Sequence, residues 1–176
     1  MTMLTLHPHP SNPSAAIDDV AVSVRRRGDR LALSYRPQGH ASAIVWPAEQ
    51  PPGFSDGLWR HTCFEAFVTA PGMPGYVELN LAPSGRWAAY RFTGYRAGMA
   101  RGDSAPGPIC AAAWPPTLIA GVRLADLPPN VDWRVNLSAV IELADGNRAY
   151  FALAHPEGNP DFHHPDCFRL SLPAVG

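Results

Sequence analysis

Proline and glycine are distributed along this chain so that little room is left for long helices. The 176 residues include 20 prolines and 15 glycines, together about a fifth of the chain against roughly 12% in average proteins. They form short clusters between apolar segments, for example at 51–53, 71–75, 83–85, 106–108 and 156–158. Because both residues interrupt helices and favour turns, this spacing predicts an all-β fold with many short strands.

The segments between these clusters alternate apolar and polar residues with the period of a β-strand. Every odd position of the stretch 133–143 is apolar, as expected for an antiparallel strand with one buried face. Residues 94–116 show no clear period and are expected to form a long loop with at most one helical turn. The chain is therefore expected to form one antiparallel β-sandwich domain over 1–176, with a flexible or loosely docked leader at 1–16. The other expected strands lie near 20–24, 31–35, 63–69, 76–82, 87–93, 118–124, 148–153 and 167–172.

The charge and the cysteine content argue against several classes of partner. A formal net charge of −1 predicts no general affinity for nucleic acid or for anionic membranes. The N-terminal residues do not resemble a secretory signal, and no segment approaches the roughly 20 apolar residues that span a bilayer. The odd number of cysteines, at Cys63, Cys110 and Cys167, argues against a disulfide scaffold. We therefore expect a cytoplasmic monomer or weak homodimer, with Cys63 and Cys167 as inert core thiols.

Three segments of the chain resemble a known group of ligand-binding domains. Residues 56–67 lead from an Asp and a Trp into a Glu-x-Phe strand, and 76–87 contain Tyr-x-Glu-x-Asn followed by a Pro-Ser-Gly turn. Residues 162–172 are similar to the closing strand of the same domains. The pattern resembles DOMON-like domains and the related family 9 carbohydrate-binding modules. This resemblance implies a jelly-roll or immunoglobulin-like sandwich that binds a small ligand, with carbohydrate as the leading class, without catalysis.

The expected strand at 76–82 would carry its polar side chains on one face. Its apolar residues at 77, 79 and 81 face the core, whereas Tyr76, Glu78 and Asn80 face outward. A four-residue turn at 83–86 would place Arg91 opposite Glu78, with Trp87 on the same face. Aromatic rings beside charged groups suit a sugar, which offers both apolar ring faces and hydroxyls. The alternative interpretation is a solvent-exposed ion pair between Glu78 and Arg91, contributing less than about 1 kcal/mol.

A second group of candidate residues comes from the first motif and from the C-terminal segment. Glu65 lies among apolar residues, where a carboxylate needs a partner or has a raised pKa, and Trp59 either flanks the binding cleft or caps the core. The resemblance implies that acidic residues at the positions of Asp56 and Glu65 lie near the ligand or a structural ion. The spacing of the histidines at the C-terminal end fits no standard zinc site, so they are expected either to line the rim of a pocket or to have a purely structural role. The predicted ligand-binding residues are Asp56, Trp59, Glu65, Tyr76, Glu78, Asn80, Trp87, Arg91, His163 and His164.

Three alternative functions remain open from the sequence. Some DOMON domains bind haem through Met and His ligands, and the pair available here is Met99 with a C-terminal histidine. A small enzyme could use the neighbourhood of Glu65, Asp161 and His163, although no recognised catalytic motif is present. An aromatic sheet face could instead be a protein interface. The leading prediction includes no cofactor and no metal, with haem or a structural ion as the alternatives.

Overall fold

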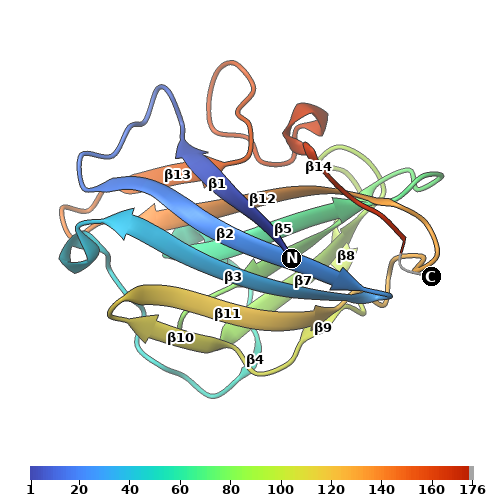
Figure 1. The fold of residues 1–176 in the computed structure, drawn as a ribbon, viewed down its shortest axis with the longest axis horizontal. Helices are drawn as coiled ribbons and strands as arrows, with labels where there is room; N and C mark the ends of the chain where they lie inside the picture. The colour runs from blue at the N-terminus through green and yellow to red at the C-terminus, as the bar shows by residue number, and fades with distance from the viewer. Residues whose placement is uncertain (175–176) are drawn as a thin grey trace.

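One hydrogen-bonded sheet of 14 strands runs through the fold (Figure 1). The computed structural model describes residues 1–174. Helical structure in this range is limited to three short 3-10 turns, η1 (Ala41–Ala43), η2 (Leu58–Arg60) and η3 (Pro165–Cys167). Within the same range, no helix has the length and apolar character needed to cross a membrane. The prediction of a nearly all-β chain is therefore confirmed.

The sheet has two halves joined by β1 (Thr2–Pro8). The first half contains, in spatial order, β10 (Cys110–Ala113), β11 (Pro116–Arg123), β3 (Arg30–Gly39) and β2 (Ile17–Arg27), with β9 (Ala105–Pro106) beside β11. The second half contains, in spatial order, β13 (Arg148–Ala152), β12 (Trp133–Glu142), β5 (Cys63–Thr69), β6 (Tyr76–Leu81), β7 (Arg86–Phe92) and β4 (Gly53–Phe54). Two further strands lie beside β12 and β7, namely β14 (Leu170–Leu172) and β8 (Ala100–Arg101). Strand β1 pairs with both β2 and β13, and the pairing is antiparallel throughout except between β4 and β7.

The sheet curls so that apolar side chains from its two halves pack together. Val22, Leu33 and Leu118 contribute from the first half, and Leu79 and Leu137 contribute from the second. All five side chains are almost fully buried, because alternate residues of each strand point to the same side. We call this cluster the main core. Figure 1 shows the strands of the first half lying in front of those of the second.

The opposite face of the second half carries a smaller apolar cluster. Phe67, Tyr76 and Phe92 extend from β5, β6 and β7 on this face, and Phe162 and Phe168 cover part of it from the C-terminal segment. We call this cluster the outer cluster. It anchors the segment between β13 and β14 against the sheet, and that segment supplies part of the candidate site.

Several sequence-based expectations need correction. Residues 1–16 are not a loosely docked leader, because β1 lies within the ladder and buries Leu6 in the main core. Residues 94–116 hold the short strands β8, β9 and β10 in place of a loop with a helical turn, and strands this short show no detectable alternation. The last strand begins only at Leu170, because Pro165–Cys167 form η3.

The predicted pairing of β6 with β7 is wrong by one residue. The loop has three residues, Pro83 to Gly85, because Gly85 adopts a positive φ of 88° and closes a turn shorter than the four residues expected. Ala82 N accordingly donates to Arg86 O at 3.0 Å, and Trp87 lies opposite Leu81. The faces of β6 are as predicted, but those of β7 are exchanged.

Candidate functional site

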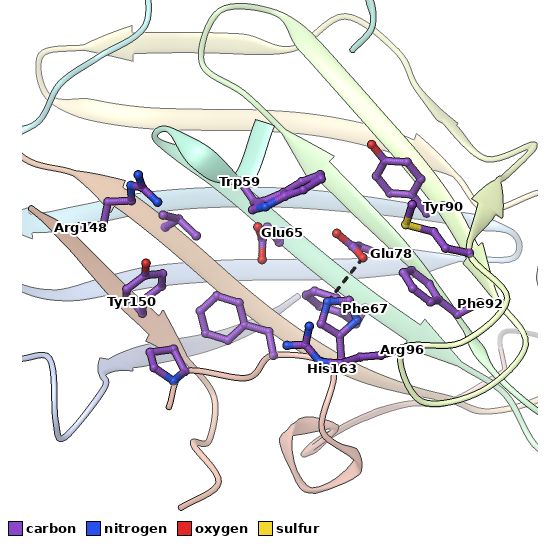
Figure 2. Close-up of a pocket in the computed structure, with 14 residues that line it drawn as sticks. Trp59, Glu65, Phe67, Glu78, Tyr90, Phe92, Arg96, Arg148, Tyr150 and His163 are labelled. Carbon is purple, nitrogen blue, oxygen red and sulfur yellow. Dashed lines mark ion pairs between the residues drawn. The ribbon is translucent and has the colours of Figure 1, made fainter. Parts of the chain in front are cut away.

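A cavity of about 480 Å³ lies on the outer face of the second half of the sheet (Figure 2). Its floor comes from β5, β6 and β7 and comprises Glu65, Phe67, Glu78, Tyr90 and Phe92. One side comes from β12 and β13 and comprises Val140, Arg148 and Tyr150. The rim comes from η2 and from two loops and comprises Trp59, Arg96, Met99, Pro160, Phe162 and His163. We call this the ligand cavity.

Strand alternation places two carboxyl groups on the floor of the ligand cavity. Glu65 lies opposite Asn80 across β5 and β6, and Glu78 lies opposite Phe67 on the same two strands. The two glutamates are therefore diagonal neighbours on one sheet face. Glu65 is only 2% exposed and Glu78 only 6% exposed. Each is nevertheless directed into the cavity, below the indole of Trp59 in Figure 2.

Each buried carboxyl group has one neutral hydrogen-bond donor. Ser138 Oγ donates to Glu65 Oε2 at 2.9 Å, and Asn80 Nδ2 donates to Glu78 Oε1 at 2.7 Å. Burial, together with the nearby charge of Glu78, raises the pKa of Glu65 to about 8 against the opposing effect of Ser138. Burial also raises the pKa of Glu78 to about 7, although the Asn80 hydrogen bond and Arg96 act in the opposite direction. Both groups therefore titrate near neutral pH.

His163 connects the outer cluster to Glu78. Its Nδ1 lies 2.7 Å from the Tyr76 hydroxyl, which also accepts a hydrogen bond from Arg96 N at 3.2 Å. Its Nε2 lies 3.9 Å from Glu78 Oε2. Burial lowers the pKa of His163 to about 4, so the ring is neutral at pH 7. In the tautomer that fits these contacts, the Tyr76 hydroxyl donates to Nδ1, and Nε2 carries the proton on the side of Glu78 without a hydrogen bond at 3.9 Å.

Loop residues outside the sheet hold the rim in place. Arg96 forms an ion pair with Asp161, at 2.8 Å between Nη2 and Oδ1, and the Tyr95 hydroxyl donates to the same carboxylate. Burial is the largest single effect on the pKa of Asp161 and acts to raise it. The hydrogen bond from Tyr95 and the contacts with Arg96 together outweigh burial, so the pKa of Asp161 lies below its ordinary value. These contacts join the loop after β7 to the segment after β13. The two rim segments are thereby fixed relative to each other.

The exposed aromatic side chain at the mouth of the cavity is Trp59. It is 40% exposed and packs edge-on against Tyr90, with 6.5 Å between the ring centroids. The Tyr90 hydroxyl donates to Asp56 Oδ1 at 2.7 Å, so Asp56 holds Tyr90 from outside the cavity. An indole held in this way has an apolar surface available for a ligand.

The structure brings together some of the predicted site residues and separates others. Trp59, Glu65, Glu78 and His163 line the ligand cavity. Asp56, Tyr76 and Asn80 lie behind it and hydrogen bond to residues that line it. Three predicted residues lie elsewhere, namely Trp87, Arg91 and His164.

The physical reasons for these separations differ. Trp87 packs on the main core, and Arg91 is exposed opposite Val77, because the register of β7 is shifted by one residue. The alternative interpretation of an exposed ion pair between Glu78 and Arg91 is therefore wrong. His164 Nδ1 accepts a hydrogen bond from Asp166 N at 3.2 Å, in the turn that begins η3.

Several residues that line the cavity were missed from the sequence. Tyr90 and Phe92 would have followed from the correct register of β7, and Tyr150 from the alternation of β13. Arg96 and Phe162 belong to loops, and no local pattern shows that these loops reach the sheet.

The residues of the ligand cavity do not fit a haem group. Met99 and His163 both line the cavity, but the two ring nitrogens of His163 already face Tyr76 and Glu78. The two buried carboxyl groups on the floor of the cavity do not provide the apolar surface that a haem would need. In residues 1–174, no three His, Cys, Asp or Glu side chains are grouped so that they could hold a metal ion.

Comparison with known proteins relates this chain to carbohydrate-binding structures by fold. No protein-family model matches the chain, and no curated protein matches it in sequence. A protein from Bacteroides uniformis, provisionally described as carbohydrate-binding, matches 96% of this chain and 84% of its own chain, with a TM-score of 0.64 and 14% identity. A family 9 carbohydrate-binding module from Caldicellulosiruptor kristjanssonii, solved with cellotriose, matches 88% and 74%, with a TM-score of 0.50 and 10% identity. Similarity at this level of identity concerns the fold, and the DOMON part of the resemblance stays a prediction.

Proposed function

We propose that this chain is a non-catalytic carbohydrate-binding protein that holds a sugar in the ligand cavity. The observation that carries the proposal is that the partly exposed Trp59 indole lines the same cavity as the carboxyl groups of Glu65 and Glu78 (Figure 2). A pyranose has apolar ring faces and a girdle of hydroxyls. It therefore needs an aromatic surface and fixed hydrogen-bonding groups within one pocket.

The dimensions and lining of the cavity support a small polar ligand. A volume of about 480 Å³ lies within the range of about 300–1,000 Å³ that is usual for small-molecule sites. Phe67, Tyr90, Phe92, Tyr150 and Phe162 provide apolar ring surface around the two carboxyl groups. Because these carboxyl groups are buried, a hydrogen bond to a sugar hydroxyl meets little competition from water.

The fold neighbours support the same class of ligand. The cellotriose complex concerns a family 9 module, and the Bacteroides protein carries a provisional carbohydrate-binding description. We infer by analogy that the curled sheet here is a β-sandwich of the family 9 type, with the ligand on the outer face of one half. Haem binding is not favoured by these neighbours.

The geometry does not favour an enzyme. Glycosidases divide their work between one carboxyl group with a raised pKa and one that stays ionised. Here burial raises the pKa of both Glu65 and Glu78. In the alternative site of Glu65, Asp161 and His163, Asp161 is ion-paired with Arg96 and accepts a hydrogen bond from the backbone N of His163, while the His163 ring lies nearest to Glu78.

Calorimetric titration with glucose and cellotriose tests the proposal. Trp59→Ala should weaken binding of the better of the two sugars by about 10-fold or more, because the stacking surface is lost. Trp114→Ala is the matched control, since Trp114 is 81% exposed in the turn between β10 and β11, outside the cavity. This control should bind like the unmodified protein. An equal affinity in the Trp59 variant, or no binding of any of the sugars titrated to the unmodified protein, would contradict the proposal.

A further inference from the structure

The two carboxyl groups on the cavity floor each have an oxygen without a hydrogen-bond partner in residues 1–174. Glu65 Oε2 accepts a hydrogen bond from Ser138 Oγ, and Glu78 Oε1 accepts one from Asn80 Nδ2. Glu65 Oε1 receives no hydrogen bond from the described residues, and Glu78 Oε2 has only His163 Nε2 at 3.9 Å. When both groups are ionised, the floor of the cavity is therefore a surface of hydrogen-bond acceptors. A ligand that fills it must supply donors.

The positive groups near the floor do not neutralise these carboxylates. Arg96 is already ion-paired with Asp161 at 2.8 Å. The His163 ring is neutral near pH 7 because burial lowers its pKa to about 4. Arg148 is exposed and lies opposite Glu142 in the β12–β13 ladder, at the far end of the cavity from His163 (Figure 2). None of the ion pairs among residues 1–174 includes Glu65.

The walls around this acidic floor are aromatic. Trp59, Phe67, Tyr90 and Phe92 line the same cavity as the two glutamates. Aromatic rings attract cations through their negative faces, and a buried carboxylate without a counter-charge is unfavourable. Both features favour a ligand that brings a positive charge into the cavity. A neutral sugar would meet the hydroxyl requirement but leave the charge uncompensated.

We propose that the ligand cavity selects an amino sugar with a free, protonated amine, whose ammonium group lies between Glu65 and Glu78 while its ring packs against Trp59. This inference rests on the proposed carbohydrate-binding function and specifies its ligand class. The ammonium donates hydrogen bonds to Glu65 Oε1 and Glu78 Oε2. Its charge also favours the ionised forms of both groups, offsetting the burial that raises their pKa values to about 8 and about 7.

Titration of the unmodified protein with three monosaccharides at pH 7 tests this assignment. Glucosamine carries the amine, N-acetylglucosamine carries an uncharged amide at the same carbon, and glucose carries a hydroxyl there. Glucosamine should bind at least 10-fold more tightly than glucose, and acetylation should abolish this advantage. Because this comparison uses only the unmodified protein, it does not depend on whether any variant folds.

Two variants then localise the charge preference. Glu65→Gln and Glu78→Gln each remove one carboxylate with little change in shape, and each should reduce the ratio of glucosamine to glucose affinity by about 3-fold or more. Glu49→Gln is the control, because Glu49 is an exposed carboxylate outside the cavity, and its ratio should equal that of the unmodified protein. A preference retained in both cavity variants would overturn the assignment.

The possible outcomes separate this inference from the proposed function. If glucose or cellotriose binds at least as tightly as glucosamine, the amino-sugar assignment is wrong and the carbohydrate-binding function stands. If none of these sugars binds, both are wrong. Binding of methylammonium with the affinity of glucosamine would show a cation site without sugar recognition, and would also overturn the amino-sugar assignment.

Discussion

Burial changes the chemistry available to individual carboxyl groups in this protein. Glu65 and Glu78 are shielded on the outer face of β5 and β6, and their only close donors are neutral. His163 faces Glu78 as a neutral ring, because burial lowers its pKa. A hydrogen bond from a ligand to such a group is stronger than one made at the surface.

The residue-scale prediction concerns Glu78→Gln. The amide keeps the acceptor for Asn80 but removes the charge, so binding of cellotriose or glucosamine should weaken by about 1.5–3 kcal/mol. The thermal midpoint without ligand should change little near pH 6.5, where much of Glu78 is already protonated with a pKa of about 7. Calorimetric titration and thermal unfolding of this variant measure both effects. Equal ligand-induced shifts in midpoint for the variant and the unmodified protein would exclude Glu78 from the site.

The hairpin of β6 and β7 decides which side chains reach the cavity. Gly75 directly precedes β6 and lies against the end of β7, where Phe92 lines the ligand cavity. A Cβ on Gly75 would lie 1.9 Å from Phe92 O and 2.6 Å from Phe92 C. These atoms belong to the backbone and cannot rotate away. The position therefore requires glycine for the close approach of two chain segments.

The element-scale prediction is that Gly75→Ala destabilises the protein by about 2 kcal/mol or more, because the end of β7 must move. Gly121→Ala is the control, because a Cβ there meets no atom within 4 Å on the exposed face of β11. The control should change the free energy of unfolding by less than about 1 kcal/mol. Urea unfolding measures the free energy of unfolding of both variants. A similar small change in each would show that the hairpin accommodates the added methyl group.

The pH dependence of folding reports the buried carboxyl pair at the scale of the whole molecule. Both glutamates have an ordinary pKa of 4.5, which folding raises to about 8 for Glu65 and about 7 for Glu78. Between pH 4.5 and these raised values, the folded protein binds more protons than the unfolded chain. The free energy of unfolding therefore falls as pH rises through this range. The lowered pKa of His163 has the opposite effect, because folding then loses stability as pH falls from 6.5 towards about 4. Burial lowers the pKa values of His9 and His155 in the same direction.

The window from pH 6.5 to pH 8 contains most of the titration of the folded glutamates, and the smaller opposing effect of the histidines fades within it. We expect the free energy of unfolding to fall by about 1–3 kcal/mol across it, and the double variant Glu65→Gln/Glu78→Gln to lose most of this slope. Urea unfolding at three pH values within the window measures the effect. The same slope in the double variant, or no slope in the unmodified protein, would show that these carboxyl groups are not buried as described.

Local patterns in the sequence predict the all-β class and the faces of β6. Proline and glycine clusters limit helix length. The period of two in β6 places Glu78 on the same face of the strand as Asn80, and Leu79 on the other face. The strands β5 and β12 are likewise predicted from their own residues, at 63–69 and 133–143. These properties depend on residues close together in the chain, so a local pattern contains them.

The set of side chains that share the cavity depends on contacts between distant parts of the folded chain. The left-handed conformation of Gly85 makes the hairpin loop one residue shorter than predicted. Tyr90 therefore lies opposite Glu78 in place of the predicted Arg91. The contact of Arg96 with Asp161 brought two distant loops together over the sheet. Register and loop docking depend on turn geometry and on contacts between residues far apart in the chain, whereas alternation depends only on neighbours. For that reason the sequence identified the strands and part of the site, and only the folded chain assembled the cavity.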